Sequence, residues 1–423
     1  MKPLVDIIDR HKHGQPVGVY SLCSAHPWVI EAAMRESRAA ALPLLLEATC
    51  NQVNQFGGYT GLTPANFRQF AQDIAQRVAF PLDRLLLGGD HLGPNVWQKE
   101  TADVAMAHSD ELVGQYVAAG FRKIHLDCSM ACAGDPSPLP EAVVASRAVR
   151  LCAVAERAWQ RHGGEPPVYV IGTEVPTPGG AGEDQGSLSV TTPESAKATI
   201  EEHRRAFTEA GLAGAWSRVI ALVVQPGVDF GSESVVDYRS ENARDLSEFI
   251  ARDPQFVFEA HSTDYQTPEN LMALVRDHFA ILKVGPAATF ALRETLWALD
   301  AIEGELPGVA RHSGLREVVL RAMRANPIHW RGHYGNSANE ALDLAYSLSD
   351  RIRYYWPQPD VQQACAALLG NLRNLALPLT LVSQYLPRQY AAIRAGQLDA
   401  TVDALLHDGV AAALRPYIRA CGT

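Results

Sequence analysis

The sequence predicts a (β/α)₈ barrel followed by an all-α C-terminal extension. Eight short, nearly continuous apolar runs lie in the first part of the chain, and amphipathic helical patterns separate them. The repeat averages about 37 residues per strand and helix, as in barrels of this class. A doubly wound open sheet is the competing architecture, and the count of eight favours the barrel.

The expected strands are rich in Val, Ile and Leu and do not alternate with polar residues. Strands that are buried on both faces require this pattern. In chain order they are Val17–Cys23, Pro43–Thr49, Arg84–Asp90, Lys123–Cys128, Val168–Val175, Arg218–Gln225, Gln255–His261 and Phe279–Gly285.

The expected helices between these strands begin at typical start signals. Thr63, Thr192 and Thr267 each precede a proline, which places a hydroxyl N-cap before a proline at the first helical position. The helices are Pro27–Ala40, Pro64–Val78, Asp110–Ala119, Pro140–Arg161, Pro193–Ala210, Asn242–Arg252 and Pro268–His278.

Beyond about Ile302 the strand signal stops and only helical patterns continue. We therefore expect a barrel over residues 1–302 and a helical extension over residues 303–423. No Gly/Ser-rich or Pro-rich linker separates the two, so the extension is expected to pack on the barrel. Its helices are Gly314–Arg324, Asn339–Ser347, Asp360–Asn374, Pro387–Ala395 and Ala400–Ala420.

Composition narrows the classes of function. The chain is 47% hydrophobic and 20% charged, which favours a large core over disorder. Its net charge of −10 disfavours nucleic acid and anionic membranes as partners. The polar N-terminus and the lack of a long apolar run predict neither a signal peptide nor a membrane span. Seven cysteines without paired spacing indicate reduced thiols in a cytoplasmic protein.

Catalytic groups of a barrel stand at the C-terminal ends of its strands. His91, Glu174 and His261 end alternate strands and form the predicted set of divalent-metal ligands. Asp90, next to His91, is the predicted general base. Glu47 and Asp127 are candidates for further acid–base roles, or together with His125 they form an internal polar network with no chemical role.

Phosphate and sugar contacts are expected at several other strand ends and loops. Gly179 and Gly180 lie in a glycine-rich loop, and Lys283 and Gly285 end the last strand, where barrels commonly hold phosphate. The glycine run is equally compatible with a plain surface loop. Arg351 and Arg353 lie among three aromatic residues in the extension. This segment either binds a phosphate through the two arginines or is a helix that packs its aromatic side chains on the barrel. The remaining predicted substrate contacts are Asn51, Gln55, Asn95, Gln225 and Ser262.

Several long motifs resemble the GatZ/KbaZ family, over essentially the whole chain. They are Ser24-Ala25-His26-Pro27, Glu47–Thr63 (EATCNQVNQFGGYTGLT), Gly88–Asn95 (GGDHLGPN), Lys123–Asp127, Gly172–Pro176 (GTEVP), Glu259–Thr267 (EAHSTDYQT) and Ser347–Pro357 (SLSDRIRYYWP).

The resemblance implies a barrel and a place in galactitol, tagatose or N-acetylgalactosamine catabolism. The family was named as the non-catalytic subunit of class II D-tagatose-1,6-bisphosphate aldolase, and many members were labelled tagatose-6-phosphate kinases. Some relatives are known as metal-dependent D-tagatose-6-phosphate 4-epimerases. No Walker loop or G-x-G-x-x-G motif follows a strand, so neither a kinase activity nor a nucleotide cofactor is expected.

We therefore expect an epimerase that interconverts D-tagatose 6-phosphate and D-fructose 6-phosphate. Inversion at C4 is expected to proceed by retro-aldol cleavage and re-addition, with deprotonation and transient oxidation as other routes. The expected cofactor is Mg²⁺, Mn²⁺, Co²⁺, Ni²⁺ or Zn²⁺. The alternative is a non-catalytic subunit that stabilises an aldolase catalytic subunit, and a homo-oligomer is expected in either case.

Overall fold

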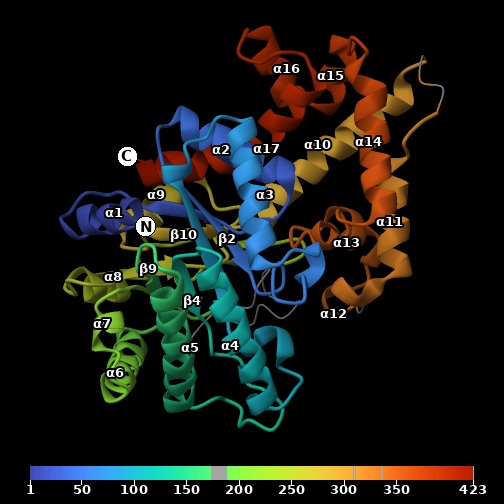
Figure 1. The fold of residues 1–423 in the computed structure, drawn as a ribbon. Coiled ribbons are helices and arrows are strands. Elements are labelled where there is room, and N and C mark those ends of the chain that lie inside the picture. Colours follow the sequence, from blue (N-terminus) through green and yellow to red (C-terminus); the bar gives the residue numbers. More distant parts are fainter. Residues whose placement is uncertain (173–187, 308, 310, 335–336, 423) are drawn as a thin grey trace.

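The computed structural model describes residues 1–172, 188–307, 309, 311–334 and 337–422. Eight parallel strands close into a barrel in the order β1-β10-β9-β6-β5-β4-β3-β2, which confirms the predicted fold (Figure 1). The strands are β1 Val19–Leu22, β2 Leu44–Thr49, β3 Leu85–Leu92, β4 Lys123–Leu126, β5 Val168–Ile171, β6 Val219–Val224, β9 Val257–Ala260 and β10 Ile281–Val284. Seven of them fall within a predicted apolar run, and β3 continues two residues past the predicted end at Asp90.

The predicted helices around the barrel are also present. They are α2 Pro27–Ala39, α3 Pro64–Arg77, α4 Ala102–Ala118, α5 Glu141–His162, α6 Pro193–Glu209, α8 Arg244–Ala251 and α9 Pro268–Arg276. The hydroxyls of Thr63, Thr192 and Thr267 accept from backbone N–H groups at the starts of α3, α6 and α9, as expected of N-caps. The prediction for α4 began too late, because the helix starts at Ala102 and not at Asp110.

Several elements were not predicted from the sequence. The two short strands β7 Asp229–Phe230 and β8 Val235–Val236 form an antiparallel pair after β6. They are too short to give a periodic pattern. The short helix α7 Ala213–Trp216 precedes β6, and the long helix α10 Pro286–Glu305 follows β10.

The N-terminal helix α1, Lys2–Lys12, covers one end of the barrel. Leu4, Ile7 and Ile8 of this helix form a core with residues at the beginnings of the strands, among them Val19 and Val257. This end is therefore filled with apolar side chains. The opposite end, where the strands terminate, is left for polar groups.

The extension consists of helices that continue from α10 and then return to the barrel (Figure 1). They are α11 Leu315–Ala325, α12 Arg331–Tyr334, α13 Glu340–Tyr346, α14 Pro359–Arg373, α15 Leu379–Tyr385, α16 Pro387–Arg394 and α17 Val402–Gly422. Single turns of 3₁₀ helix lie at η4 Pro327–His329 and η5 Arg351–Tyr354. α12 and α15 were not in the prediction, and the domain boundary at residue 302 stays a prediction.

The last helix, α17, packs directly on the barrel. It contacts α2, α9, α10 and β1, and Gly18 N–H donates to the carbonyl of Cys421 at 3.0 Å. The Tyr417 hydroxyl donates to the carbonyl of Thr263 at 2.6 Å. The C-terminal end of the chain thus forms part of the outer helical layer of the barrel.

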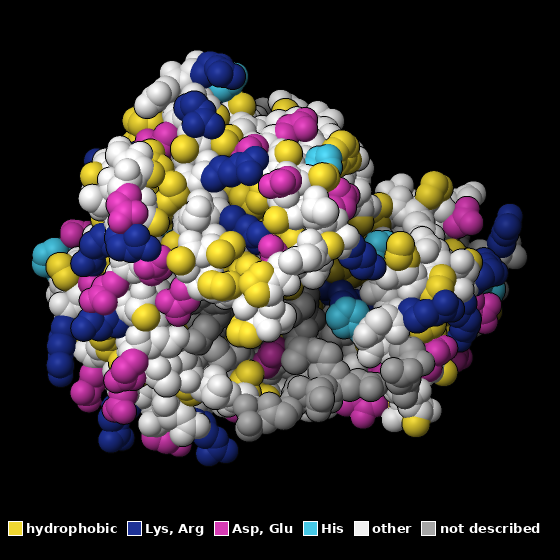
Figure 2. Space-filling model, turned by 90° about the horizontal axis from the view of Figure 1, so that it is seen from below, with side chains coloured by type: hydrophobic (Ala, Val, Ile, Leu, Met, Phe, Trp, Pro, Cys, Tyr) yellow, Lys and Arg dark blue, Asp and Glu magenta, His cyan; other side chains and the backbone are white. Residues whose placement is uncertain are grey.

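The surface carries charges of both signs. Figure 2 shows acidic and basic side chains intermixed over the face that it draws. Among the described helices, none is both long enough and apolar enough to cross a membrane.

Candidate metal and substrate site

Charged side chains fill the centre of the barrel and form a chain of ion pairs. Lys123 Nζ on β4 lies 2.7 Å from Glu47 Oε1 and 2.5 Å from Glu259 Oε2. Lys283 Nζ on β10 lies 2.5 Å from Glu47 Oε2 and 3.0 Å from Asp90 Oδ2. All five side chains are buried. Buried charges are found in proteins when they are paired in this way.

Three histidines lie beside these ion pairs. The ring centroids of His91, His125 and His261 are 5.0 to 5.3 Å apart. Each ring has a carboxylate partner, as metal-binding histidines commonly do. His91 Nδ1 lies 2.7 Å from Asp127 Oδ2, His125 Nδ1 lies 2.8 Å from Asp90 Oδ1, and His261 Nε2 lies 3.0 Å from Glu259 Oε1.

Two glycines provide the space that this arrangement needs. A Cβ on Gly93 would lie 1.7 Å from the carbonyl oxygen of Asp127, so only glycine allows the end of β3 to approach that residue. A Cβ on Gly88 would lie 2.8 Å from Glu47 Cγ.

Two residues at the strand ends have a strained backbone, since His91 and Ser262 adopt positive φ angles of 49° and 54°. Such strained backbone is concentrated at functional sites, because the surrounding structure must hold it in place.

The charges of the cluster do not cancel. Four buried carboxylates, those of Glu47, Asp90, Asp127 and Glu259, face two lysine ammonium groups. With neutral imidazoles, two negative charges are therefore left over. Burial lowers the pKa of His91, but the carboxylates of Asp90 and Asp127 outweigh burial and raise it. A proton on His91 can thus compensate part of the excess, and a divalent cation would compensate all of it.

The donor atoms fit a metal ion. Asp90, His125, Glu259 and His261 each offer one nitrogen or oxygen atom within 4.8 Å of the others. His125 Nε2 is buried and has no hydrogen-bond partner, although buried polar atoms normally have one. Mixed imidazole and carboxylate donors suit Zn²⁺, Ni²⁺, Co²⁺ and Mn²⁺. This group shares His261 with the predicted metal set, while Glu174 of that set lies outside the described residues.

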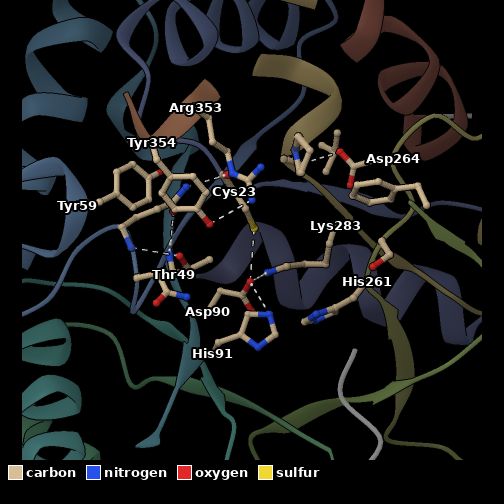
Figure 3. Close-up of a pocket in the computed structure, with 17 residues that line it drawn as sticks. Cys23, Thr49, Tyr59, Asp90, His91, His261, Asp264, Lys283, Arg353 and Tyr354 are labelled. Carbon is tan, nitrogen blue, oxygen red and sulfur yellow. Dashed lines mark hydrogen bonds and ion pairs between the residues drawn. The ribbon is translucent and has the colours of Figure 1, made fainter. Parts of the chain in front are cut away.

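A pocket opens beside the cluster, and residues from both the barrel and the extension line it (Figure 3). Asp90, His91 and His261 lie at one side of the view, and Arg353 and Tyr354 lie at the other. Other residues of the lining are Cys23, Thr49, Asn51, Gln52, Tyr59, Ser262, Asp264, Lys283 and Gly285.

Not every predicted contact reaches this pocket. Gln225 turns its side-chain oxygen to the N–H groups of Gly227 and Val228, so it shapes the loop after β6. Gln55 donates to the carbonyl of His108 at 3.0 Å. Asn95 and Arg351 line a neighbouring hollow that also includes Asn51. Gly179 and Gly180 lie outside the described residues.

The start of α10 is already occupied by a side chain. Asp264 Oδ1 accepts from the N–H groups of Gly285 and Ala287, at 3.0 and 2.8 Å. Burial raises the pKa of Asp264 to about 6, against the effect of these two hydrogen bonds. The Gly285 amide therefore has a partner within the protein, and a phosphate would have to compete with Asp264 for it.

Sequence reasoning assigned no role in the chemistry to Lys123, Glu259, Asp264 or Tyr354. Lys123 and Glu259 could have been found, because each is a charged residue within a predicted buried strand and must have a partner there. Tyr354 could not, because its place depends on how the extension folds back on the barrel.

The fold and the cluster define a (β/α)₈-barrel protein with a candidate divalent-metal site at its strand ends. The chain belongs to the family described as D-tagatose-1,6-bisphosphate aldolase subunit GatZ/KbaZ-like, whose model matches residues 4–422.

A solved structure described as a "probable tagatose 6 phosphate kinase" from Sinorhizobium meliloti 1021 is similar over nearly the whole chain. It shares 50% identity with a TM-score of 0.88, and the match covers 96% of this chain and 100% of that one. The fructose-bisphosphate aldolase of Campylobacter jejuni is 14% identical with a TM-score of 0.42, covering 92% and 93% of the two chains.

Proposed function

We propose that this protein is a metal-dependent epimerase that interconverts D-tagatose 6-phosphate and D-fructose 6-phosphate. One observation supports this most: a single pocket joins an acidic cluster of metal-type donors to the guanidinium group of Arg353. The donors suit the carbonyl and hydroxyl oxygens of a sugar, and an arginine suits its phosphate.

The substrate would lie along the pocket with its two ends at different residues. Its C1–C3 end would face Asp90, His91 and His261, and its 6-phosphate would face Arg353. A divalent cation held by the donors would supply Lewis acidity for the C2 carbonyl. The paired lysines and glutamates hold these side chains in place, so little reorganisation is needed during the reaction.

Inversion would proceed by cleavage and re-addition. Asp90 accepts the proton of the C4 hydroxyl while the C3–C4 bond breaks, and the bonding electron pair remains on the C1–C3 fragment. The C4 aldehyde then turns its other face toward C3. The same electron pair re-forms the C3–C4 bond, and O4 takes up a proton. No oxidant or nucleotide is consumed.

A second candidate is a subunit that stabilises an aldolase partner and has no turnover of its own. The family description, which names an aldolase subunit, favours this function. The ion pairs of the barrel centre are also compatible with it, because each lysine has its carboxylate partners without a substrate.

The two functions are separated by assaying the isolated chain. It is incubated with fructose 6-phosphate and with Mg²⁺, Mn²⁺, Co²⁺, Ni²⁺ or Zn²⁺ in turn, and tagatose 6-phosphate is measured. We expect the wild type to convert the substrate. The His261→Ala variant should lose both this conversion and the uptake of metal. His162→Ala, at the exposed end of α5, is the matched control. Protection of an aldolase partner without conversion would support the subunit, and consumption of ATP with tagatose 6-phosphate would support a kinase.

A further inference from the structure

Inversion at C4 needs proton transfer on two sides of the substrate, and the residues predicted for the second side do not line the pocket that Asp90 lines. Asp127 Oδ2 lies 2.7 Å from His91 Nδ1, and Asp127 Oδ1 accepts from Ser129 Oγ at 2.6 Å. Glu47 lies between two lysines. Neither residue is in the described lining of the pocket. A second acid–base group must therefore come from elsewhere.

Tyr354 of η5 lines the same pocket as Asp90, and it comes from the extension (Figure 3). Its ring packs against two other rings. It stacks on His329 with centroids 4.7 Å apart and rings 7° from parallel, and it meets Tyr59 at 4.6 Å. An aromatic ring that packs on two other rings in this way keeps its hydroxyl in one position.

The hydroxyl of Tyr354 accepts hydrogen bonds from two arginines. Arg351 Nη1 donates to it at 3.0 Å and Arg353 Nη2 donates at 3.2 Å. These charged donors leave the hydroxyl proton free to point at a ligand, and they stabilise the oxygen when that proton has left.

We propose that Tyr354 is the second acid–base residue of the epimerase, facing the C4 oxygen from the side opposite Asp90. This inference rests on the proposed function. It assigns the extension a direct part in the reaction, because η5 supplies the residue and the barrel supplies its counterpart.

The surroundings of the hydroxyl favour its ionisation. Burial raises the pKa of Tyr354, but the guanidinium groups of Arg353 and Arg351 outweigh burial and lower it. The other titratable neighbours of its ring are Tyr59 and His329. The nearby carboxylate of Asp350 is turned away, to Thr289 Oγ1 at 2.5 Å.

The proton balance of the proposed step is closed. In one direction Asp90 takes the O4 proton during cleavage, and the Tyr354 hydroxyl gives its proton to O4 during re-addition. In the other direction the two residues exchange roles. After a turnover in the first direction Asp90 carries an extra proton and Tyr354 lacks one, and after a turnover in the other direction the reverse holds. Exchange with solvent restores both groups.

Asp264 is the competing candidate, since it lines the pocket as well. Its Oδ1 already accepts from two N–H groups at the start of α10, which makes it a cap of that helix. If Asp264 turned toward the substrate to exchange a proton, the two amides would lose their hydrogen-bond partner.

The inference is tested with Tyr354→Phe, which keeps the ring contacts with Tyr59 and His329 and removes only the hydroxyl. We expect kcat for epimerisation to fall by about 100-fold or more, the usual contribution of an acid–base group, with the metal content unchanged. Tyr346→Phe, an exposed tyrosine of α13, is the matched control. Wild-type activity must be present first, so a failure of the proposed function is seen separately.

A pH profile separates proton transfer from mere positioning of the arginines. Because the phenol must keep its proton in the active form, kcat/KM should fall at high pH. The fall should occur at a pH below 10.0, the usual pKa of tyrosine, because the pKa of Tyr354 is lowered. Replacing Tyr354 with a fluorinated tyrosine lowers the pKa of the phenol and keeps its hydrogen bonds, so it should restore activity and move this fall to lower pH. The inference would be overturned if Tyr354→Phe remained active, or if the fluorinated tyrosine left the fall of kcat/KM at high pH where it is in the wild type. It would also be overturned if a folded Asp264→Asn variant lost epimerisation while Tyr354→Phe kept it.

Discussion

Lys123 holds two carboxylates together at the centre of the barrel. Its ammonium group lies within 2.7 Å of both Glu47 and Glu259, and none of the three side chains is exposed. Removal of one partner from a buried ion pair leaves the other charge without compensation, and this costs far more than the pair contributes.

Lys123→Met is therefore expected to destabilise the metal-free protein by about 3–5 kcal/mol. It also adds one negative charge to the excess, so added divalent cation should raise the Tm of the variant more than that of the wild type. Unfolding by denaturant and by heat, with and without metal, measures both effects.

Lys197→Met is the matched control, because Lys197 and its partner Glu201 are largely exposed and lie 3.7 Å apart. A change within about 0.5 kcal/mol is expected there. If Lys123→Met changed the free energy of unfolding as little as this control, the buried ion pairs of the barrel centre would not be needed for the stability of the fold.

At the scale of elements, α17 and α10 approach each other closely. A Cβ on Gly409 of α17 would lie 2.0 Å from Thr295 Oγ1 of α10 and 3.0 Å from Thr295 Cβ. Thr295 has little room to move, because its hydroxyl donates to the carbonyl of Ala291 at 2.9 Å. The glycine thus sets how near the last helix lies to the helix that follows β10.

Gly409→Ala is expected to lower the free energy of unfolding by about 1–3 kcal/mol, the usual cost of overpacking. Gly304→Ala in α10 serves as the comparison, because nothing lies within 4 Å of the added Cβ. There the better helix propensity of alanine should stabilise the protein by roughly 0.5–1 kcal/mol. Thermal unfolding of the two variants should shift Tm in opposite directions, and equal shifts would contradict the close approach of the helices.

At the scale of the whole molecule, the sequence predicts the barrel well, because its signals are local. Eight apolar runs and three Thr-Pro helix starts determine the order of strands and helices without any knowledge of tertiary contacts. The polar residues at strand ends, such as Asp90, His91 and His261, follow from the same pattern, because all parallel strands end at the same mouth.

Contacts between distant segments could not be predicted in this way. The partner of His125 is Asp90, and the partner of His91 is Asp127, so these two carboxylates pair with histidines of a neighbouring strand. Gln225 follows a strand, as the predicted ligands do, yet a local turn takes its side chain. Arg353 and Tyr354 reach the pocket only because the extension folds back over the barrel mouth.

The central claim is that metal held at the barrel mouth enables this chain to invert C4 of a sugar phosphate. It is tested most directly by NMR of fructose 6-phosphate in D₂O, with the chain first stripped of metal and then given each divalent cation. We predict no tagatose 6-phosphate before the addition and its appearance afterwards, with no deuterium on carbon at C4, because cleavage leaves the C4–H bond intact. Equal conversion by the stripped chain, or no conversion with any of the cations, would contradict the claim.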